Sequence, residues 1–436
     1  MNRLFIRLVI AVSVALCGVS CIRDEVGTSP SHQPEFSADT LSFGTVWAGE
    51  LSPTAAVRVY NRHSDAMVIS SLTISGNDAA AMSLNVDGTS CTSASGVEIR
   101  ANDSIFILAA VTPAHGGDLD ITLELTVNGS VTTLPVSAGV MDPLTLTDAD
   151  ITADAALEGN VRVFGALTVA PGAVLTLKPG TVLWLHDGAE ITVNGKLEAQ
   201  GTPDRPIRLR GDRTGFVAAD IPYEIMSGQW QGITLAQECA PCSLSFVRME
   251  NSVGGIVLEE GASLNMTDCI VTNSRENLIT AAPGSSLTAS GCTFTEAGGA
   301  LLSLDGCAAL LTRCTLANNY LFAAPAEPAI VLSGDKDFRI TGSIVYRPGS
   351  EIAKESLGDG VIFECCMFGS KGSDDSNFVG CIWDADPMFM LDLDSYIFDY
   401  RLDSQSPARG AGSAGGPAVD YFGVPASNPP ALGAYN

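Results

Sequence analysis

A repeat of about 22 residues, running from Leu244 to Tyr346, constrains the fold of this chain more than any other feature. Five aligned segments place one residue each in a shared column: Val247, Cys269, Cys292, Cys314 and Ser343. The successive steps are 22, 23, 22 and 29 residues, and the last is longer because the loop 323–328 is inserted. A constant period of this length is typical of proteins built from stacked repeats.

The residue types within each repeat favour strands. In the segment from Leu264 to Val271, apolar side chains recur with the period of two that is typical of strands. No repeat contains ten residues with helical periodicity. A repeat of this length suits one coil of a parallel β-helix, with three short strands and three turns. Strands of successive coils then lie about 4.8 Å apart, so equivalent residues stack on one another. The sequence therefore predicts a solenoid with its column of thiols pointing inward.

A second column lies four residues after the first and contains Asn251, Asn273, Glu296, Asn318 and Arg347. Stacked asparagine amides can hydrogen-bond along a solenoid axis and to the backbone of a turn. We therefore expect this column to mark a turn between two strands of each coil.

Two further segments carry a resemblance to a known family. Residues 163–211, beginning VFGALTVAPGAVLTLKPG, are similar to the first coils of secreted bacterial β-helix proteins. The ending, with ADPMF from Ala385, DYRLDSQSPARGAG from Asp399 and a final ALGAYN, is similar to the segments that close many of them. With the repeat, these segments resemble the right-handed parallel β-helix of the pectin-lyase-like superfamily. The resemblance implies such a β-helix, with a C-terminal cap, over residues 150–436, but no particular activity.

Residues 36–140 are predicted to form a separate domain. About seven alternating strands with turn signals between them suit an immunoglobulin-like β-sandwich. The stretch LSFGTVWAGE, from Leu41, resembles the abnormal-spindle/Hydin type of bacterial module, which implies a spacer or a binding unit. The predicted fold class is therefore all-β, with a right-handed parallel β-helix solenoid preceded by an immunoglobulin-like β-sandwich.

The beginning of the chain predicts export. Residues 1–21 read as a lipoprotein signal peptide, in which Arg3 and Arg7 precede an apolar run too short to span a bilayer. The stretch ending at Cys21 resembles a bacterial lipobox, which implies that Cys21 is lipid-modified; a plain signal peptide is the alternative. Residues 22–35 are predicted to be a tether. We expect an exported protein anchored to the bacterial outer membrane, at the cell surface, with its orientation open.

The charge balance restricts the partners. The chain has 23 basic and 49 acidic residues, a formal net charge of −26. Such a surface repels nucleic acid, so no nucleic-acid partner is expected, and it disfavours a polyanionic substrate unless a cation bridges the two. The membrane is expected to be reached through the lipid anchor alone.

An insertion at residues 212–229 interrupts the coils, and insertions on a regular scaffold often carry function. It lies beside five candidate ligand-binding residues, which could combine guanidinium groups with aromatic platforms for a sugar or a carboxylate: Arg208, Arg210, Arg213, Tyr223 and Trp230. The alternative is an ordinary loop that covers a solvated strand.

The sequence lacks the catalytic signatures of enzymes that resemble this fold. Lyases that resemble this fold use calcium-binding carboxylates with a basic residue, and related hydrolases use paired aspartates with His-Gly and Arg-x-Lys signatures. The chain has no Arg-x-Lys, and its one His-Gly, at His115, lies outside the predicted β-helix. No catalytic residue, metal or cofactor is therefore predicted. Four clustered aspartates could hold a cation, but turn carboxylates are the favoured interpretation: Asp384, Asp386, Asp392 and Asp394.

The cysteines outside the inward column are disulfide candidates in an exported protein. They are the pair Cys239 and Cys242 and the group Cys365, Cys366 and Cys381. A metal site is the alternative interpretation of these thiols.

Together these features favour a lipid-anchored surface protein that binds or adheres to glycans without catalysis, with glycans or envelope components as partners. A polysaccharide lyase or glycoside hydrolase is the first alternative, and a structural envelope protein is the second.

Overall fold

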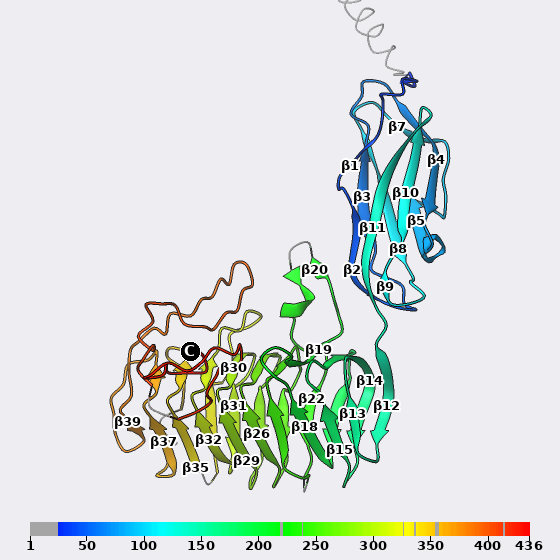
Figure 1. Ribbon diagram of the computed structural model, residues 1–436. Coiled ribbons are helices and arrows are strands. Elements are labelled where there is room, and N and C mark those ends of the chain that lie inside the picture. The colour runs from blue at the N-terminus through cyan, green and yellow to red at the C-terminus, as the bar shows by residue number, and fades with distance from the viewer. Residues whose placement is uncertain are drawn as a thin grey trace, which may run out of the picture. The chain divides into compact units, whose positions relative to one another are not determined.

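The computed structural model describes residues 25–218, 221–237, 239–325, 327–334, 337–353, 357–412 and 415–436 (Figure 1). The chain divides into two compact units, one ending at Asp142 and one beginning at Pro143. The predicted signal peptide and the lipidation site Cys21 lie outside the described residues.

The first unit is a β-sandwich, as predicted. One sheet contains, in spatial order, β1 (Glu35–Phe36), β3 (Ala55–Tyr60), β8 (Ser104–Val111), β5 (Met82–Val86) and β6 (Thr89–Cys91). The other contains β2 (Leu41–Trp47), β11 (Ser130–Met141), β10 (Ile121–Val127), β4 (Met67–Ser75) and β7 (Val97–Ile99), with β9 (Gly117–Asp118) paired to β11. The short 3₁₀ turn η1 (Ala79–Ala81) precedes β5. Alternate residues such as those of β10 are buried between the two sheets.

The segment predicted as a tether packs on this sandwich from Glu25 onward. The Gly27 N–H donates to the Ala66 carbonyl, and the Ala66 N–H donates to the Glu25 carbonyl, both at 2.9 Å. The Asn128 side chain donates to the Ser29 carbonyl at 2.9 Å. These contacts extend the ordered unit to the first residue that the structure describes.

The second unit is a parallel β-helix with three strand-bearing faces. We call the face of the predicted repeat the first sheet: β12 (Leu144–Ile151), β14 (Asn160–Val169), β16 (Val182–Leu185), β19 (Ile207–Gly211), β24 (Val247–Glu250), β27 (Ile270–Ser274), β30 (Thr293–Ala297), β33 (Thr315–Ala317), β36 (Ile344–Tyr346) and β38 (Met367–Phe368). Every pairing between these strands is parallel.

The second sheet joins the first through β14, which pairs with β16 along one half and with β17 along the other. It continues through β17 (Glu190–Val193), β22 (Gly232–Leu235), β25 (Ile256–Leu258), β28 (Ile279–Ala281), β31 (Leu302–Asp305) and β34 (Ile330–Ser333).

The third sheet closes each coil and also stacks in parallel (Figure 1). It contains β13 (Ala155–Leu157), β15 (Val174–Leu177), β18 (Lys196–Gln200), β23 (Cys242–Ser245), β26 (Ser263–Thr267), β29 (Ser286–Ser290), β32 (Ala308–Thr312), β35 (Asp337–Thr341), β37 (Val361–Glu364) and β39 (Phe378–Val379). The insertion carries the hairpin β20 (Phe216–Ala218) and β21 (Ile221–Pro222), followed by the 3₁₀ turn η2 (Tyr223–Ile225).

The thiol column points inward, as predicted. Cys269, Cys292 and Cys314 are buried in the core of the β-helix. Each thiol donates to the carbonyl two residues before it, at 3.3, 3.4 and 3.6 Å. The residue between each cysteine and its carbonyl acceptor has a positive φ, as at Asp268 and Arg313. The column therefore closes the turn that leads from the third sheet into the first.

The disulfide predictions are wrong, because each of the ten cysteines that the structure describes is a free thiol. Cys366 continues the inward column 23 residues after Ser343, and its thiol donates to the Glu364 carbonyl at 3.4 Å. Cys365 is the left-handed turn residue before it. The Cys242 thiol is fully buried and accepts the Leu197 N–H at 3.3 Å.

The second column forms the turn between the first and second sheets, as expected. Asn251, Asn273 and Glu296 have φ values of 69°, 58° and 60°, a region that asparagine tolerates better than most residues. Asn318 hydrogen-bonds the Ala297 backbone through both its amide oxygen and nitrogen, at 3.0 and 2.9 Å.

The predicted C-terminal cap covers the side of the β-helix. Tyr400, Tyr421 and Tyr435 form an apolar cluster with Ile270 and Ala317 of the first sheet. A second cluster packs further apolar residues of this segment against β36 and β38: Leu402, Ala408, Ala431 and Leu432. The segment from 385 to 436, orange to red in Figure 1, therefore covers the outer face of the first sheet in its last coils.

Candidate functional site

The outer face of the first sheet carries one continuous row of side chains. The strand register aligns Arg162 with Trp184 and Trp184 with Arg210 in the first coils. Further along, the register aligns Glu250, Thr272, Thr295, Ala317 and Tyr346. Charged residues thus occupy the early coils, and hydroxyl-bearing and small residues follow them.

Glu250 is the centre of the charged part of this row. Its side chain is 5% exposed and contacts three arginines: Arg248 Nε lies 2.6 Å from one carboxylate oxygen, and Arg208 and Arg210 approach the other. Burial by itself would raise the pKa of Glu250, but the three guanidinium groups outweigh it and lower the pKa to about 2. Glu250 is therefore ionised at neutral pH.

The insertion is held over this part of the row by the asparagine column. The Asn251 amide donates to the carbonyls of Glu224 and Met226, at 2.7 and 3.0 Å. The Asn273 amide donates to the Glu224 carbonyl at 3.4 Å. The Ser227 hydroxyl, which also belongs to the insertion, lies 2.7 Å from the Tyr320 hydroxyl. These contacts fix η2 as a wall above the sheet.

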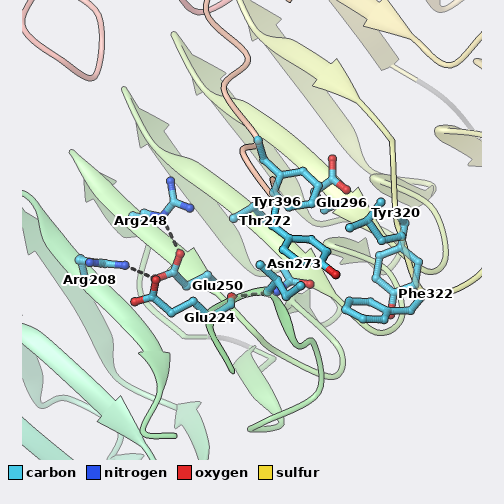
Figure 2. Close-up of a pocket in the computed structure, with 13 residues that line it drawn as sticks. Arg208, Glu224, Arg248, Glu250, Thr272, Asn273, Glu296, Tyr320, Phe322 and Tyr396 are labelled. Carbon is cyan, nitrogen blue, oxygen red and sulfur yellow. Dashed lines mark hydrogen bonds and ion pairs between the residues drawn. The ribbon is translucent and has the colours of Figure 1, made fainter. Parts of the chain in front are cut away.

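A cavity of about 180 Å³ lies between this wall, the sheet and the C-terminal segment (Figure 2). In Figure 2, Arg208, Arg248 and Glu250 gather at one end, and the rings of Tyr320 and Phe322 gather at the other. The lining residues are Arg208, Glu224, Ile225, Arg248, Glu250, Thr272, Asn273, Glu296, Tyr320, Leu321, Phe322, Tyr396 and Phe398. The cavity therefore has a charged end and an aromatic end.

Glu296 lies on the floor of the cavity and differs from Glu250 in its protonation. Burial raises the pKa of Glu296 to about 7, although a hydrogen bond from the Tyr400 hydroxyl lowers it in part. Burial also raises the pKa of Tyr400 well above its usual value, so its hydroxyl keeps its proton and donates. The cavity thus combines Glu250, which is charged at neutral pH, with Glu296, which changes protonation near neutral pH.

Arg208 is the one predicted binding residue that lines the cavity. Arg210 is 5% exposed, because its guanidinium lies 5.0 Å from the Trp184 ring and pairs with Glu224 at 2.8 Å. Arg210 therefore contacts the Trp184 ring and the insertion, and its guanidinium has little exposed surface for a ligand.

Two other candidates, Arg213 and Tyr223, contact each other outside the cavity. The guanidinium carbon of Arg213 lies 5.9 Å from the centre of the Tyr223 ring, and Arg213 pairs with Asp187 at 3.2 Å. Neither side chain lines the cavity described above.

Trp230 is fully buried, and its indole N–H donates to the Glu250 carbonyl at 2.9 Å. The prediction of a sugar platform at Trp230 is wrong, because its ring packs in the core where no ligand can reach it.

The remaining site residues were missed, although two signals point to them. Glu296 occupies a position where three of the other repeats have asparagine, and Tyr320 and Phe322 directly precede the inserted loop 323–328. At both places the sequence departs from the repeat. Such departures can indicate a functional site, because the stacking of coils does not require them. Tyr396 and Phe398 also line the cavity. They belong to the C-terminal segment, so nothing in the repeat points to them.

The described residues show no metal centre and no membrane span. Among them, no group of three or more His, Cys, Asp or Glu side chains is arranged to hold a metal ion. Asp386 and Asp392 instead accept N–H groups of nearby residues, at 2.8 and 3.2 Å, as turn carboxylates do. No helix in this part of the chain is long and apolar enough to cross a bilayer.

Comparisons with known proteins found a family and a solved structure, each of which is similar to part of this chain. Residues 223–381 match the family described as the right handed beta helix region. The solved ASH / PapD-like domain of human CEP192 (PapD-like domain 7) is similar to 26% of this chain and 89% of its own, with 12% identity and a TM-score of 0.20. No curated protein matches the sequence. The chain thus contains a right-handed β-helix preceded by an immunoglobulin-like sandwich.

Proposed function

We propose that the β-helix unit binds a glycan in the cavity on its first sheet and does so without catalysis. The observation that supports this proposal is the arrangement of aromatic rings opposite an arginine–glutamate network within one cavity. Binding sites commonly combine apolar walls with a few polar groups that fix the orientation of the ligand.

The chemistry of each end suits a sugar. A ring such as that of Tyr396 can stack on the apolar C–H face of a pyranose. Arg208 and Arg248 keep side chains that are about a third exposed, at 38% and 35%, so part of each guanidinium remains available to hydroxyl or carboxylate oxygens. The cavity is smaller than the roughly 300 Å³ lower bound for drug-sized ligands, which suits a single sugar unit.

The test is a glycan array followed by titration calorimetry with the best glycan. Arg208→Gln and Tyr396→Ala should each weaken binding about tenfold, because each removes a direct contact. The matched control is Arg339→Gln. Arg339 is also an exposed arginine paired with a glutamate, Glu364, but it lies on the third sheet. The proposal fails if no glycan binds, or if all three variants bind as the wild type does.

A second candidate function is hydrolysis or lyase cleavage of a polysaccharide. Its support is the pair Glu250 and Glu296, with pKa values of about 2 and about 7 in the same cavity. Such a separation allows one carboxylate to stay charged while the other holds a proton. An assay for new reducing ends and for the absorbance of unsaturated uronates would reveal turnover. Glu296→Gln should abolish it if Glu296 is the acid. A purely structural role in the envelope would leave both binding and turnover absent.

We also propose that the protein is exported and lipid-anchored through Cys21 at the outer surface of a bacterial cell. The support is the basic, apolar and lipobox-like stretch of residues 1–21. Cys21→Ala should release the protein from the membrane fraction or leave the precursor uncut. Mass spectrometry that finds a mature N-terminus at another residue, without lipid, would contradict this proposal.

A further inference from the structure

The aromatic end of the cavity continues onto the protein surface as an apolar rim. Leu321 and Phe322 line the cavity, yet they are 39% and 43% exposed. Tyr320, Tyr396 and Phe398 also line the cavity and are half-buried. We use the name apolar rim for these five residues. Large apolar side chains that are both exposed and adjacent to a cavity indicate a contact surface more often than isolated ones do.

The rim residues are held in place by contacts at the base of their loop. The Tyr320 hydroxyl lies 2.7 Å from Ser227 of the insertion, and the Asn319 amide donates to the Tyr400 hydroxyl at 3.1 Å. The Phe322 ring packs edge-on against the Tyr320 ring, with their centres 5.5 Å apart. Leu321 and Phe322 are therefore presented outward by a loop that is anchored on both the insertion and the C-terminal segment.

The opposite end of the cavity has a different chemistry. Arg208, Arg248 and Glu250 offer charged donors and acceptors there, as Figure 2 shows. A ligand that satisfies both ends has a polar head and an apolar extension. A plain oligosaccharide would leave Leu321 and Phe322 in water, whereas a hydrocarbon chain alone would form no hydrogen bonds with the charged end.

We infer that the ligand is an amphipathic glycoside, in which a sugar head occupies the charged end and an alkyl or acyl chain lies across Leu321 and Phe322. This inference rests on the proposed glycan binding and adds the class of its ligand. Burial of about two methylene groups against the rim corresponds to a gain in affinity of roughly tenfold.

The experiment compares the methyl and n-octyl glycosides of the sugar that binds best on the array, by calorimetry below the micelle concentration. The n-octyl glycoside should bind about tenfold more tightly than the methyl glycoside. If neither compound binds, the proposed glycan binding itself fails. If both bind with equal affinity, glycan binding stands and the amphipathic ligand is wrong.

Variants assign the gain to the rim. Leu321→Ser and Phe322→Ser should reduce the affinity for the n-octyl glycoside to that for the methyl glycoside, with little change in the latter. The matched control is Leu310→Ser, because Leu310 is 45% exposed on β32 of the third sheet and should leave both affinities unchanged. Equal loss of n-octyl affinity in Leu310→Ser would overturn the assignment.

A last arm separates a sugar-bearing ligand from a bare lipid surface. Sedimentation of the Cys21→Ala protein, which has no site for a lipid anchor, with phosphatidylcholine vesicles should recover no more protein than a vesicle-free sample, whereas vesicles that also carry an alkyl glycoside of the best sugar should recover it. Equal sedimentation with both kinds of vesicle, lost in Phe322→Ser, would show that the rim contacts membranes without a sugar and would overturn the inference.

Discussion

The outer face of the first sheet buries charge in its early coils and mostly apolar and hydroxyl-bearing groups in its late coils. In the early coils, the side chain of Arg162 pairs with Asp212 at 2.7 Å, and Arg210 pairs with Glu224, both under the insertion. In the late coils, Ile270 and Ile344 pack under the tyrosines and leucines of the C-terminal segment. The outer face of the same strands can therefore bury either charged or apolar side chains, provided that the covering segment supplies opposite charges for the first and apolar side chains for the second.

The cavity lies where one kind of cover gives way to the other. Glu224 and Ile225 come from the insertion, and Tyr396 and Phe398 come from the C-terminal segment. Between the two covers the sheet is not filled, and the row changes there from Glu250 to Thr272. The contrast between the two covers thus explains why the cavity has a charged end and an aromatic end.

Inward-facing positions of the same coils should not accept charged side chains in place of apolar ones. Cys292→Arg should prevent folding, because it would place a guanidinium among the apolar side chains that pack around the thiol column, whereas Arg210 on the outer row pairs with Glu224. Cys292→Ala should cost only roughly 1–3 kcal/mol, because it leaves a small cavity. Circular dichroism and urea denaturation would measure both. A folded Cys292→Arg variant of normal stability would show that the column does not face the core.

Thiol labelling is the control for this comparison. Burial raises the pKa of Cys269 and Cys314 well above the usual thiol value, so both should resist alkylation until the protein unfolds. Cys365, which is half-buried and outside the column, should react in the native state. Rapid native labelling of Cys269 or Cys314 would contradict the inward orientation.

On the charged half of the row, Glu250→Gln should lower the free energy of unfolding by about 3 kcal/mol, because Arg208, Arg210 and Arg248 lose their shared counter-charge. The matched control is Glu224→Gln. Glu224 also pairs with Arg210, but its side chain is 61% exposed, so the loss should stay below about 1 kcal/mol. Chemical denaturation at pH 7 measures both. Equal losses would mean that burial does not distinguish the two pairs.

The smallest effect is a pH dependence that has opposite sign in the two halves. The pKa of Glu250 is lowered from 4.5 to about 2, so its contribution to stability is present above pH 4.5 and is lost as the pH falls toward 2. The pKa of Glu296 is raised from 4.5 to about 7, so its contribution to stability is greatest below pH 4.5 and is lost as the pH rises toward 7.

Denaturation midpoints measured from pH 2 to pH 8 would separate the two contributions. Glu296→Gln should remove part of the fall between pH 4.5 and 7 and leave the acid limb intact. Asp268 contributes to the same fall, because burial raises its pKa to about 7, so Asp268→Asn is the companion variant. An unchanged profile in both variants would show that neither carboxyl is protonated in the folded protein at pH 5.

The sequence predicts more of the fold than of the candidate site. Alternation and the 22-residue period determine which side chains point inward, and the thiol column lies where they place it. The site depends on which outward residues become covered, and the local sequence does not contain that information. Trp230 illustrates the limit, because it follows the insertion in sequence and still packs in the core.

The sequence by itself determined the stack of coils, the inward thiol column, the turn column of asparagines and the separate sandwich, because strand alternation and residue stacking are local properties repeated along the chain. Only the tertiary structure decided that Glu224, Tyr320 and Tyr396 surround one cavity. These residues come from an insertion, a loop and the C-terminal segment, which no common period relates. Their meeting depends on long-range contacts such as Ser227 with Tyr320 and Tyr400 with Glu296, which form only once the coils have stacked.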